Sequence, residues 1–460
     1  MTTDKIEGAS LSLRERITYG FGDSAANFSF ATMSAFLIFF YTDVAGISAA
    51  VVGTMMLISR VIDTLPDIPM GMLIDKTSSR FGKARPWLLG VAVPYGIALV
   101  LVFTAPNFSM TGKIVYAFIT YNLMVLLWSA LSLPFGTLIS LMTDNQNDQT
   151  FLTLCRMFFG VATALVVNSI TLKLVTAFGG GNRGWQLTAA CFGIVSILFI
   201  LTTFFSTKER VVPLKEGKVP IREGLKALAG NKYWWMVLFL GLITFFNFGL
   251  PGITIYYTQY VLHNNAVFPP IMIATFLPNL IVFLLVAPLI RKIGKRSTVF
   301  IGFFIYIVGT VIILMRPLDP TWIIAGTFIK GFGFAPIVGT LYAFVADAIE
   351  YGEWKTGIRA EGLLFSAASF GQKIGTGISL AVIGWTLHLS GYVPEAPVQA
   401  ASALSAITGL FIIVPLAGYA LVAILLIFYR LDKEYPQIIT DLRKRKEMEE
   451  LRKREAGITA

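Results

Sequence analysis

Two carboxylates, Asp63 and Asp67, lie four residues apart inside an otherwise apolar stretch, and Arg60 precedes them in the same run. A spacing of four residues puts both acids on one face of a helix. A charged side chain near the centre of a bilayer costs about 2.5 to 3.5 kcal/mol, so it usually faces a polar cavity or a partner. The pair therefore predicts a site for a cation or a proton. The alternative is that the acids only pair with Arg60 and fix the helix.

The composition of the chain indicates an α-helical membrane protein. Its mean hydropathy is +0.72, 55% of its residues are hydrophobic and 14% are charged, whereas soluble domains carry about 25% charged residues. A helix needs about 20 apolar residues to cross the hydrocarbon layer. Such runs lie at residues 17–42, 49–75, 85–105, 113–143, 152–178, 185–206, 233–262, 268–292, 297–316, 321–350, 361–390 and 404–431. We therefore expect an all-α fold with twelve transmembrane helices.

Basic residues gather in alternate loops and so predict the orientation of the helices. They precede the first run and then follow the second run, the sixth run and the eighth run, while the loops between carry few. Basic loops stay on the cytoplasmic side of a membrane. The sequence thus predicts a multi-pass protein of the inner (plasma) membrane with both termini in the cytoplasm. The net charge of +11 reflects these loops and not a nucleic-acid-binding surface.

A polar linker divides the chain into two similar halves. We expect an N-terminal six-helix bundle at 1–206, a cytoplasmic linker at 207–231, a C-terminal six-helix bundle at 232–431 and a charged cytoplasmic tail at 432–460. Residues 80–85 (RFGKAR) and 291–296 (RKIGKR) form a basic, glycine-centred loop at the same place in each half. This repetition is typical of six-plus-six transporters of the major facilitator type, in which substrate binds near mid-membrane between the halves.

The sequence argues against an enzyme or an ATP-driven pump. It contains no GxxxxGK[ST] phosphate loop and no cluster of metal-ligating residues, and its two cysteines, Cys155 and Cys191, lie inside predicted helices. We expect no cofactor apart from a coupling ion.

Several motifs together resemble the glycoside–pentoside–hexuronide:cation symporter family of the major facilitator superfamily. They are Tyr19-Gly-Phe-Gly-Asp23 with Asn27, the stretch Tyr41-Thr-Asp43-Val-x-Gly46, the run from Arg60 to Pro86, and the segment Ala346 to Gly362 followed by Lys373. The likeness runs in order from about residue 13 to 435. It implies a secondary symporter that imports a glycoside or related sugar derivative by alternating access.

The resemblance assigns the acidic pair to cation coupling. Asp63 and Asp67 match the carboxylates of the family's cation site, and Ser129 matches a hydroxyl that helps to hold the ion. Pro66 stands where melibiose permease has an asparagine that completes a sodium cage. Hard cations need several oxygen ligands, and two close carboxylates readily share a proton because like charges repel. Proton coupling is therefore favoured, with sodium bound by Asp63 and Asp67 as the alternative.

The resemblance also implies a sugar site. Arg156 and Lys373 match cationic positions of the family, while Asn27 and Ser132 replace two aspartates that accept sugar hydroxyls in melibiose permease. Loss of two acids with both bases kept favours an anionic substrate, such as a glucuronide or a sulfo-sugar. Asp23, one turn from Asn27, could compensate and restore a site for neutral sugars.

Polar residues at two cytoplasmic loops, most of them charged, are well suited to form a gate. They are Asp75, Arg80, Lys83 and Arg85 in the first half, and Asp347, Glu350, Tyr351, Glu353, Arg359 and Glu361 in the second. We expect a charge network that holds one conformation and breaks in the other. The alternative for the second group is a set of solvated loop charges.

The predicted partners are a small-molecule sugar, the coupling cation and the lipid bilayer, with no nucleic acid and a monomeric chain. A lysolipid-type facilitator of the same fold is the main alternative function. A membrane sensor is another, but it would not require coupling carboxylates.

Overall fold

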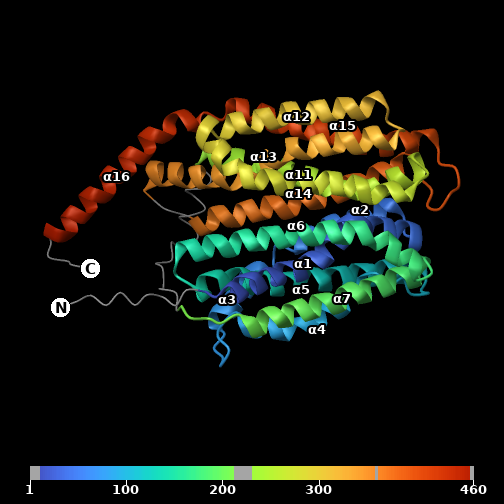
Figure 1. Cartoon of the computed structure of the whole chain (residues 1–460), viewed down its shortest axis with the longest axis horizontal. Helices are drawn as coiled ribbons and strands as arrows, with labels where there is room; N and C mark the ends of the chain where they lie inside the picture. The colour runs from blue at the N-terminus through green and yellow to red at the C-terminus, as the bar shows by residue number, and fades with distance from the viewer. Residues whose placement is uncertain (1–10, 212–229, 358–360, 456–460) are drawn as a thin grey trace.

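The computed structural model describes residues 11–211, 230–357 and 361–455 of the chain. Every regular element in this described part is helical, and it contains no β-strand. The predicted all-α fold class is confirmed. Figure 1 shows that most helices run along the long axis of the molecule, and that residues near both termini lie at one end of it. We call this end the terminal end and the opposite one the far end.

The first half begins with α1 (Leu13–Phe39), which continues into the π-helix η1 (Phe40–Val44). It continues with α2 (Ala49–Ile62), α3 (Asp67–Lys76), α4 (Arg85–Val102), α5 (Met110–Met142), α6 (Gln146–Ala177) and α7 (Gly181–Ser206). The capping box at Ser12 and Glu15 satisfies two backbone N–H groups where α1 begins.

The second half begins with one run that changes helix type along its length. This run comprises α9 (Lys232–Gly249), η2 (Leu250–Ile253), α10 (Thr254–Tyr256) and η3 (Tyr257–Val261). The short η4 (Asn265–Val267) precedes α11 (Phe268–Ile293), α12 (Lys295–Met315), α13 (Pro320–Thr356), α14 (Glu361–Leu389), α15 (Ala401–Phe428) and α16 (Leu431–Glu455).

The predicted apolar runs correspond to these helices. Within the described residues, ten helical segments are long and apolar enough to cross a membrane. The two remaining runs correspond to the pair α2–α3 and to α14. The run predicted at 49–75 is therefore not one helix, because the chain breaks between Ile62 and Asp67.

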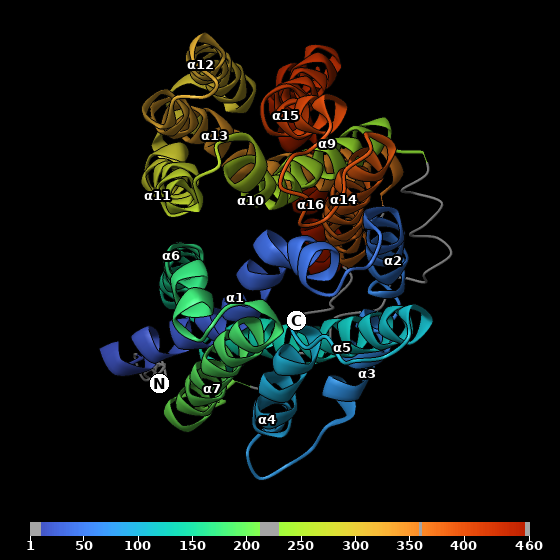
Figure 2. The same cartoon turned by 90° about the vertical axis from the view of Figure 1, so that its right-hand side faces the viewer.

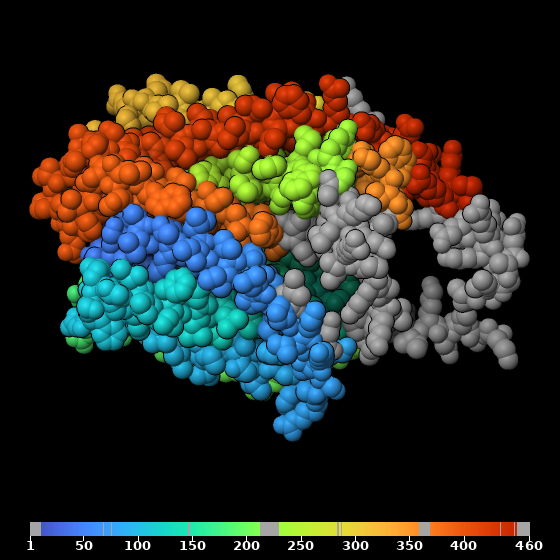
Figure 3. Space-filling view, turned by 180° about the vertical axis from the view of Figure 1, so that it is seen from behind, coloured from blue at the N-terminus to red at the C-terminus, as the bar shows by residue number. Residues whose placement is uncertain are grey.

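The helices before and after the linker gather in two groups (Figure 2). We call them the first group (α1–α7) and the second group (α9–α15). Helix α2 packs on α14, and α6 packs on α11, across the boundary between the groups. Figure 3 shows the first of these contacts on the surface, where orange α14 lies against blue α2.

The two basic loops of the predicted repeat share a backbone feature. Gly82 has φ +105° and Gly294 has φ +85°, a region that residues with a Cβ atom rarely adopt. Each glycine lies within three residues of the start of the next long helix, α4 or α12. The common geometry supports the proposed duplication.

The charged tail forms a helix that docks on the second group. Asp441 of α16 accepts a hydrogen bond from the Trp354 indole at 3.1 Å, and Arg445 donates to the Trp354 carbonyl at 2.8 Å. The first turns of α16 therefore cover the end of α13, and the helix then leaves the body of the molecule (Figure 1).

Glycines allow neighbouring helices to approach closely, as is common in membrane proteins. A Cβ atom on Gly309 of α12 would lie 2.6 Å from the Gly326 carbonyl oxygen of α13, whereas one on Gly409 of α15 would meet nothing within 4 Å. Close packing of this kind leaves no room for an added methyl group.

We predict that Gly309→Ala lowers the stability of the purified protein by about 1 to 3 kcal/mol, because the helices must separate. The matched control Gly409→Ala should keep or raise stability, since alanine favours helix by about 1 kcal/mol. Thermal unfolding in detergent measures both. Equal unfolding temperatures for the two variants would contradict the tight α12–α13 contact.

Candidate functional site

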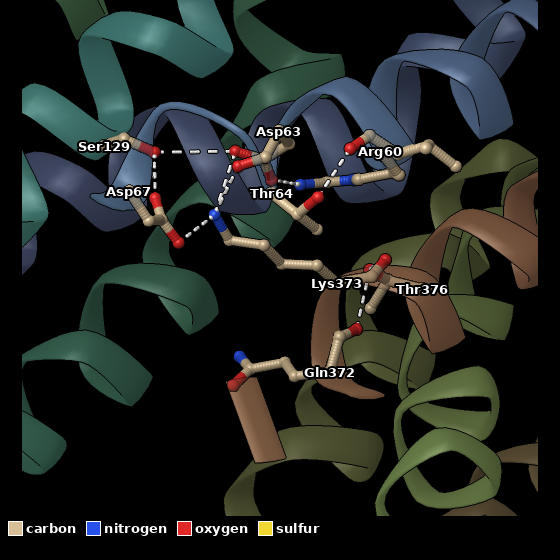
Figure 4. Close-up of polar contacts among 9 residues, drawn as sticks. Arg60, Asp63, Thr64, Asp67, Ser129, Gln372, Lys373 and Thr376 are labelled. Atoms are coloured by element: carbon tan, nitrogen blue, oxygen red, sulfur yellow. Dashed lines mark hydrogen bonds and ion pairs between the residues drawn. The ribbon is translucent and has the colours of Figure 1, made fainter. Parts of the chain in front are cut away.

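A lysine of the second group lies between the two acids of the first. The Lys373 ammonium is 3.1 Å from Asp63 Oδ1 and 2.7 Å from Asp67 Oδ2. It also donates to the backbone carbonyl of Asp63 at 2.7 Å. Figure 4 shows the lysine reaching from α14 toward both carboxylates. Asp63 is fully buried and Lys373 is 8% exposed, so the contact lies inside the molecule.

The break between α2 and α3 presents these groups. Pro66 has no N–H and its ring disfavours a continuous helix, and the hydrogen bonds of Thr64 to Val61 and Leu65 to Ile62 tighten the last turn of α2. The spacing alone predicted that both acids lie on one face of a single helix. This prediction is wrong, because the acids flank the break between α2 and α3. The break also frees the Asp63 carbonyl, which Lys373 satisfies.

The structure brings the predicted hydroxyl to the same cluster. Ser129 Oγ of α5 is 3.1 Å from Asp67 Oδ1 and 3.5 Å from Asp63 Oδ1. Arg60 Nη1 is 3.3 Å from Asp63 Oδ2, so the alternative of simple pairing holds for one acid. Asp67 pairs instead with Lys373.

The cluster as a whole is close to neutral. Two carboxylates face one guanidinium and one ammonium, and all four groups meet within hydrogen-bonding distance. Removing one partner of a buried ion pair typically costs about 3 to 5 kcal/mol. Lys373, which the resemblance grouped with the sugar site, lies in the acidic cluster instead.

A second polar cluster joins α1 to α6. Arg156 Nε is 2.7 Å from Asp23 Oδ1, and Asn27 donates to Asp23 Oδ2 at 2.9 Å. A Cβ atom on Gly160 would lie 2.5 Å from Asp23 Oδ2, so this glycine lets the two helices approach. The guanidinium of Arg156 is thus paired with Asp23. This pairing is what we expect if Asp23 compensates for the lost acids and restores a site for neutral sugars. Ser132 lies half-buried on α5.

A cavity between the two groups adjoins this second cluster. It has a volume of about 100 Å³ and is lined by Asn27 and Asn168 of the first group and by Phe248 and Asn279 of the second. Among the predicted substrate residues, all of which are described, Asn27 is the one that lines it. The position matches the expectation of a central site shared by both halves.

In the first part of the predicted gate, the described contacts are made to other residues of the N-terminal half. The backbone N–H groups of Lys83, Ala84 and Arg85 bind the carboxylate of Glu209 at 2.8 to 3.0 Å, a partner that the sequence did not suggest. The Arg80 guanidinium lies 4.7 Å from the ring centre of Phe81.

The second part of the predicted gate also contacts residues of its own group. Asp347 pairs with Lys295 at 2.5 Å, and Tyr351 packs edge-on against Tyr233. Glu350 and Glu353 lie near the end of the same helix, α13. Arg359 and the side chains of Asp75 and Glu361 lie outside the described residues. Asp347 and Tyr351 thus have partners within the second group, and the network as a whole stays a prediction.

At the far end the two groups are joined by hydroxyl contacts. Asp43 accepts hydrogen bonds from Tyr260 and from Tyr392, the latter at 2.6 Å. Next to it, the Thr42 and Tyr256 hydroxyls are 2.8 Å apart. The sequence assigned Asp43 no role, although it lies in the second motif of the resemblance. This buried carboxylate bridges the two groups at the far end.

The comparisons with known proteins agree with this architecture. The family model described as "MFS/sugar transport protein" matches residues 18–433. The isoprimeverose transporter of Lactiplantibacillus pentosus is 37% identical over 444 residues, which cover 94% of this chain and 91% of that protein. The inner membrane symporter YicJ of Escherichia coli (strain K12) is 33% identical, over 90% of this chain and 91% of its own.

A solved structure has the same fold at low sequence identity. It is a bacterial homologue of the human lysosomal transporter Spinster, with a TM-score of 0.65 and 13% identity, covering 93% of this chain and 97% of that one.

The Lys373 cluster predicts strong energetic coupling between the groups that it contains. Lys373→Met should lower the unfolding temperature, because buried Asp63 then keeps Arg60 as its one cation in the cluster and the partly exposed Asp67 loses its ion pair. Adding Asp67→Asn should restore part of the loss, with a coupling free energy of about 0.5 to 3 kcal/mol in a double-mutant cycle. Chemical or thermal unfolding of the three variants measures it. Strictly additive effects would contradict a direct Asp67–Lys373 contact.

Proposed function

Because this chain belongs to the MFS/sugar transport protein family, we propose that it imports a glycoside or related sugar derivative together with a cation. Its curated relatives are a named isoprimeverose transporter and membrane symporters. They favour sugar symport over the lysolipid-type alternative. A glycoside is the proposed substrate class, and a proton is the proposed coupling ion.

The observation that carries the proposal is the lysine shared by two acids across the group boundary. Lys373 belongs to α14 of the second group, while Asp63 and Asp67 belong to the first. A proton or sodium ion that neutralises the acids competes with the ammonium and loosens this bond between the groups. Cation binding thereby changes the relative free energy of the two arrangements, which is the requirement for coupling.

The groups around the acids favour a proton. Besides the two carboxylates, the described neighbours offer the Ser129 hydroxyl and the Asp63 carbonyl oxygen, and Pro66 contributes no side-chain oxygen. A sodium ion prefers a fuller oxygen shell, whereas a proton needs one carboxylate. Sodium remains the alternative ion.

We assign the terminal end to the cytoplasm of a bacterial-type inner membrane, since the basic loops lie there. The contacts of Asp43 with Tyr260 and Tyr392 then close the external end. Among the described residues at the other end, the ion pairs Arg16–Asp148 and Lys295–Asp347 each stay within one group. This distribution supports an inward-facing state of an alternating-access cycle.

Replacement of one acid tests the coupling. Asp67→Asn should reduce gradient-driven accumulation of labelled isoprimeverose or methyl glucuronide to background in membrane vesicles, because the site can no longer exchange its charge. Insertion into the membrane should be unchanged. The matched control Asp319→Asn, at the N-cap of α13, should keep uptake because asparagine also caps helices well. Normal accumulation by Asp67→Asn would refute the coupling role.

A further inference from the structure

A buried lysine in the second group lacks an acidic partner. Lys330 of α13 is 8% exposed. Its ammonium lies 5.0 Å from the ring centre of Tyr306 and 5.7 Å from that of Phe411. Within the described residues no carboxylate lies within ion-pair distance of it. Aromatic rings offset only part of the cost of burying an ammonium, so this lysine is an unusual choice for a packing position.

Two further polar atoms beside Lys330 lack partners. Thr327, one turn earlier on α13, is 7% exposed, and Asn247 of α9 is 8% exposed. The Thr327 hydroxyl and the Asn247 Oδ1 atom are buried without a hydrogen bond to any described residue. Native structures rarely leave such atoms unsatisfied. All three side chains line a single cavity of about 90 Å³ inside the second group.

This cavity adjoins the central one. Phe248, Pro251, Phe276 and Asn279 line both. The central cavity in turn reaches Asn27 of the first group. A ligand held between the two groups reaches Lys330 by extending past these shared residues.

We propose that Lys330, Thr327 and Asn247 bind the anionic group of the transported sugar, as in a sugar carboxylate. The ammonium and the threonine hydroxyl donate to the anionic oxygens, and Asn247 Oδ1 accepts from a neighbouring sugar hydroxyl. This inference rests on the proposed function and specifies its substrate class. The positive charge that attracts an anionic sugar is then assigned to Lys330 and no longer to Arg156 and Lys373. Both of those cations are already paired with aspartates.

A matched pair of probes tests the site. Methyl β-D-glucuronide and methyl β-D-glucoside differ in having a carboxylate or a hydroxymethyl group on the same ring. Calorimetric binding to the purified full chain should show at least about tenfold tighter binding of the glucuronide, the scale of a charged hydrogen bond. Lys330→Met, which keeps the side-chain length, should abolish that preference and leave glucoside binding within about twofold. Without ligand it should also unfold at a higher temperature, because it removes an uncompensated buried charge.

Lys232→Gln is the control, since it removes an exposed lysine that also lies over a tyrosine ring, 4.7 Å away. It should keep the preference for the glucuronide. Wild-type protein that binds both probes equally or binds neither overturns the inference, as does a retained preference in Lys330→Met. Gradient-driven uptake of the glucoside without any Lys330-dependent preference would leave the symport proposal intact. Glucuronide binding that depends on Lys330, without gradient-driven uptake, would instead refute symport alone.

Discussion

Lys373 shares its ammonium between Asp63 and Asp67, and this contact joins α14 to the break between α2 and α3. In an interior of low dielectric constant neither Lys373 nor Asp63 is stable as an unpaired charge. Each sign of charge therefore keeps the other inside the molecule. Because the partners belong to different helix groups, any ion that replaces the lysine changes how firmly the groups are held together.

A helix break supports this contact, and a second aspartate joins the two groups at the far end. Pro66 interrupts the helix and exposes a carbonyl that the lysine satisfies. At the far end Asp43 is held by hydroxyls of the second group. These two of the cross-group contacts each involve a buried aspartate of the first group, Asp63 or Asp43. They differ in partner, since one is paired with a cation and the other with neutral tyrosines.

The sequence predicted the helical class and the apolar runs, because each membrane-spanning helix requires a long run of apolar residues that is visible in the sequence. It also predicted that Asp63, Asp67 and Ser129 belong together. It did not predict the partners that depend on tertiary packing: Lys373 was grouped with the sugar site, and Lys330 was not recognised. A lysine inside an apolar run predicts that its ammonium requires a polar partner. Only the packing of α13 and α14 shows which acids, if any, lie near it. The roles of these residues in transport remain predictions.

The central claim is that Lys373 competes with the coupling ion for the two acids. Thermal unfolding of the purified protein, titrated with protons and separately with sodium at constant ionic strength, measures ion binding through the stabilisation that it confers. Lys373→Met should respond at lower ion concentration than the wild type, because the internal competitor is gone. A variant that responds only at higher concentration, or no longer responds, would contradict the claim, since Lys373 would then help to hold the ion.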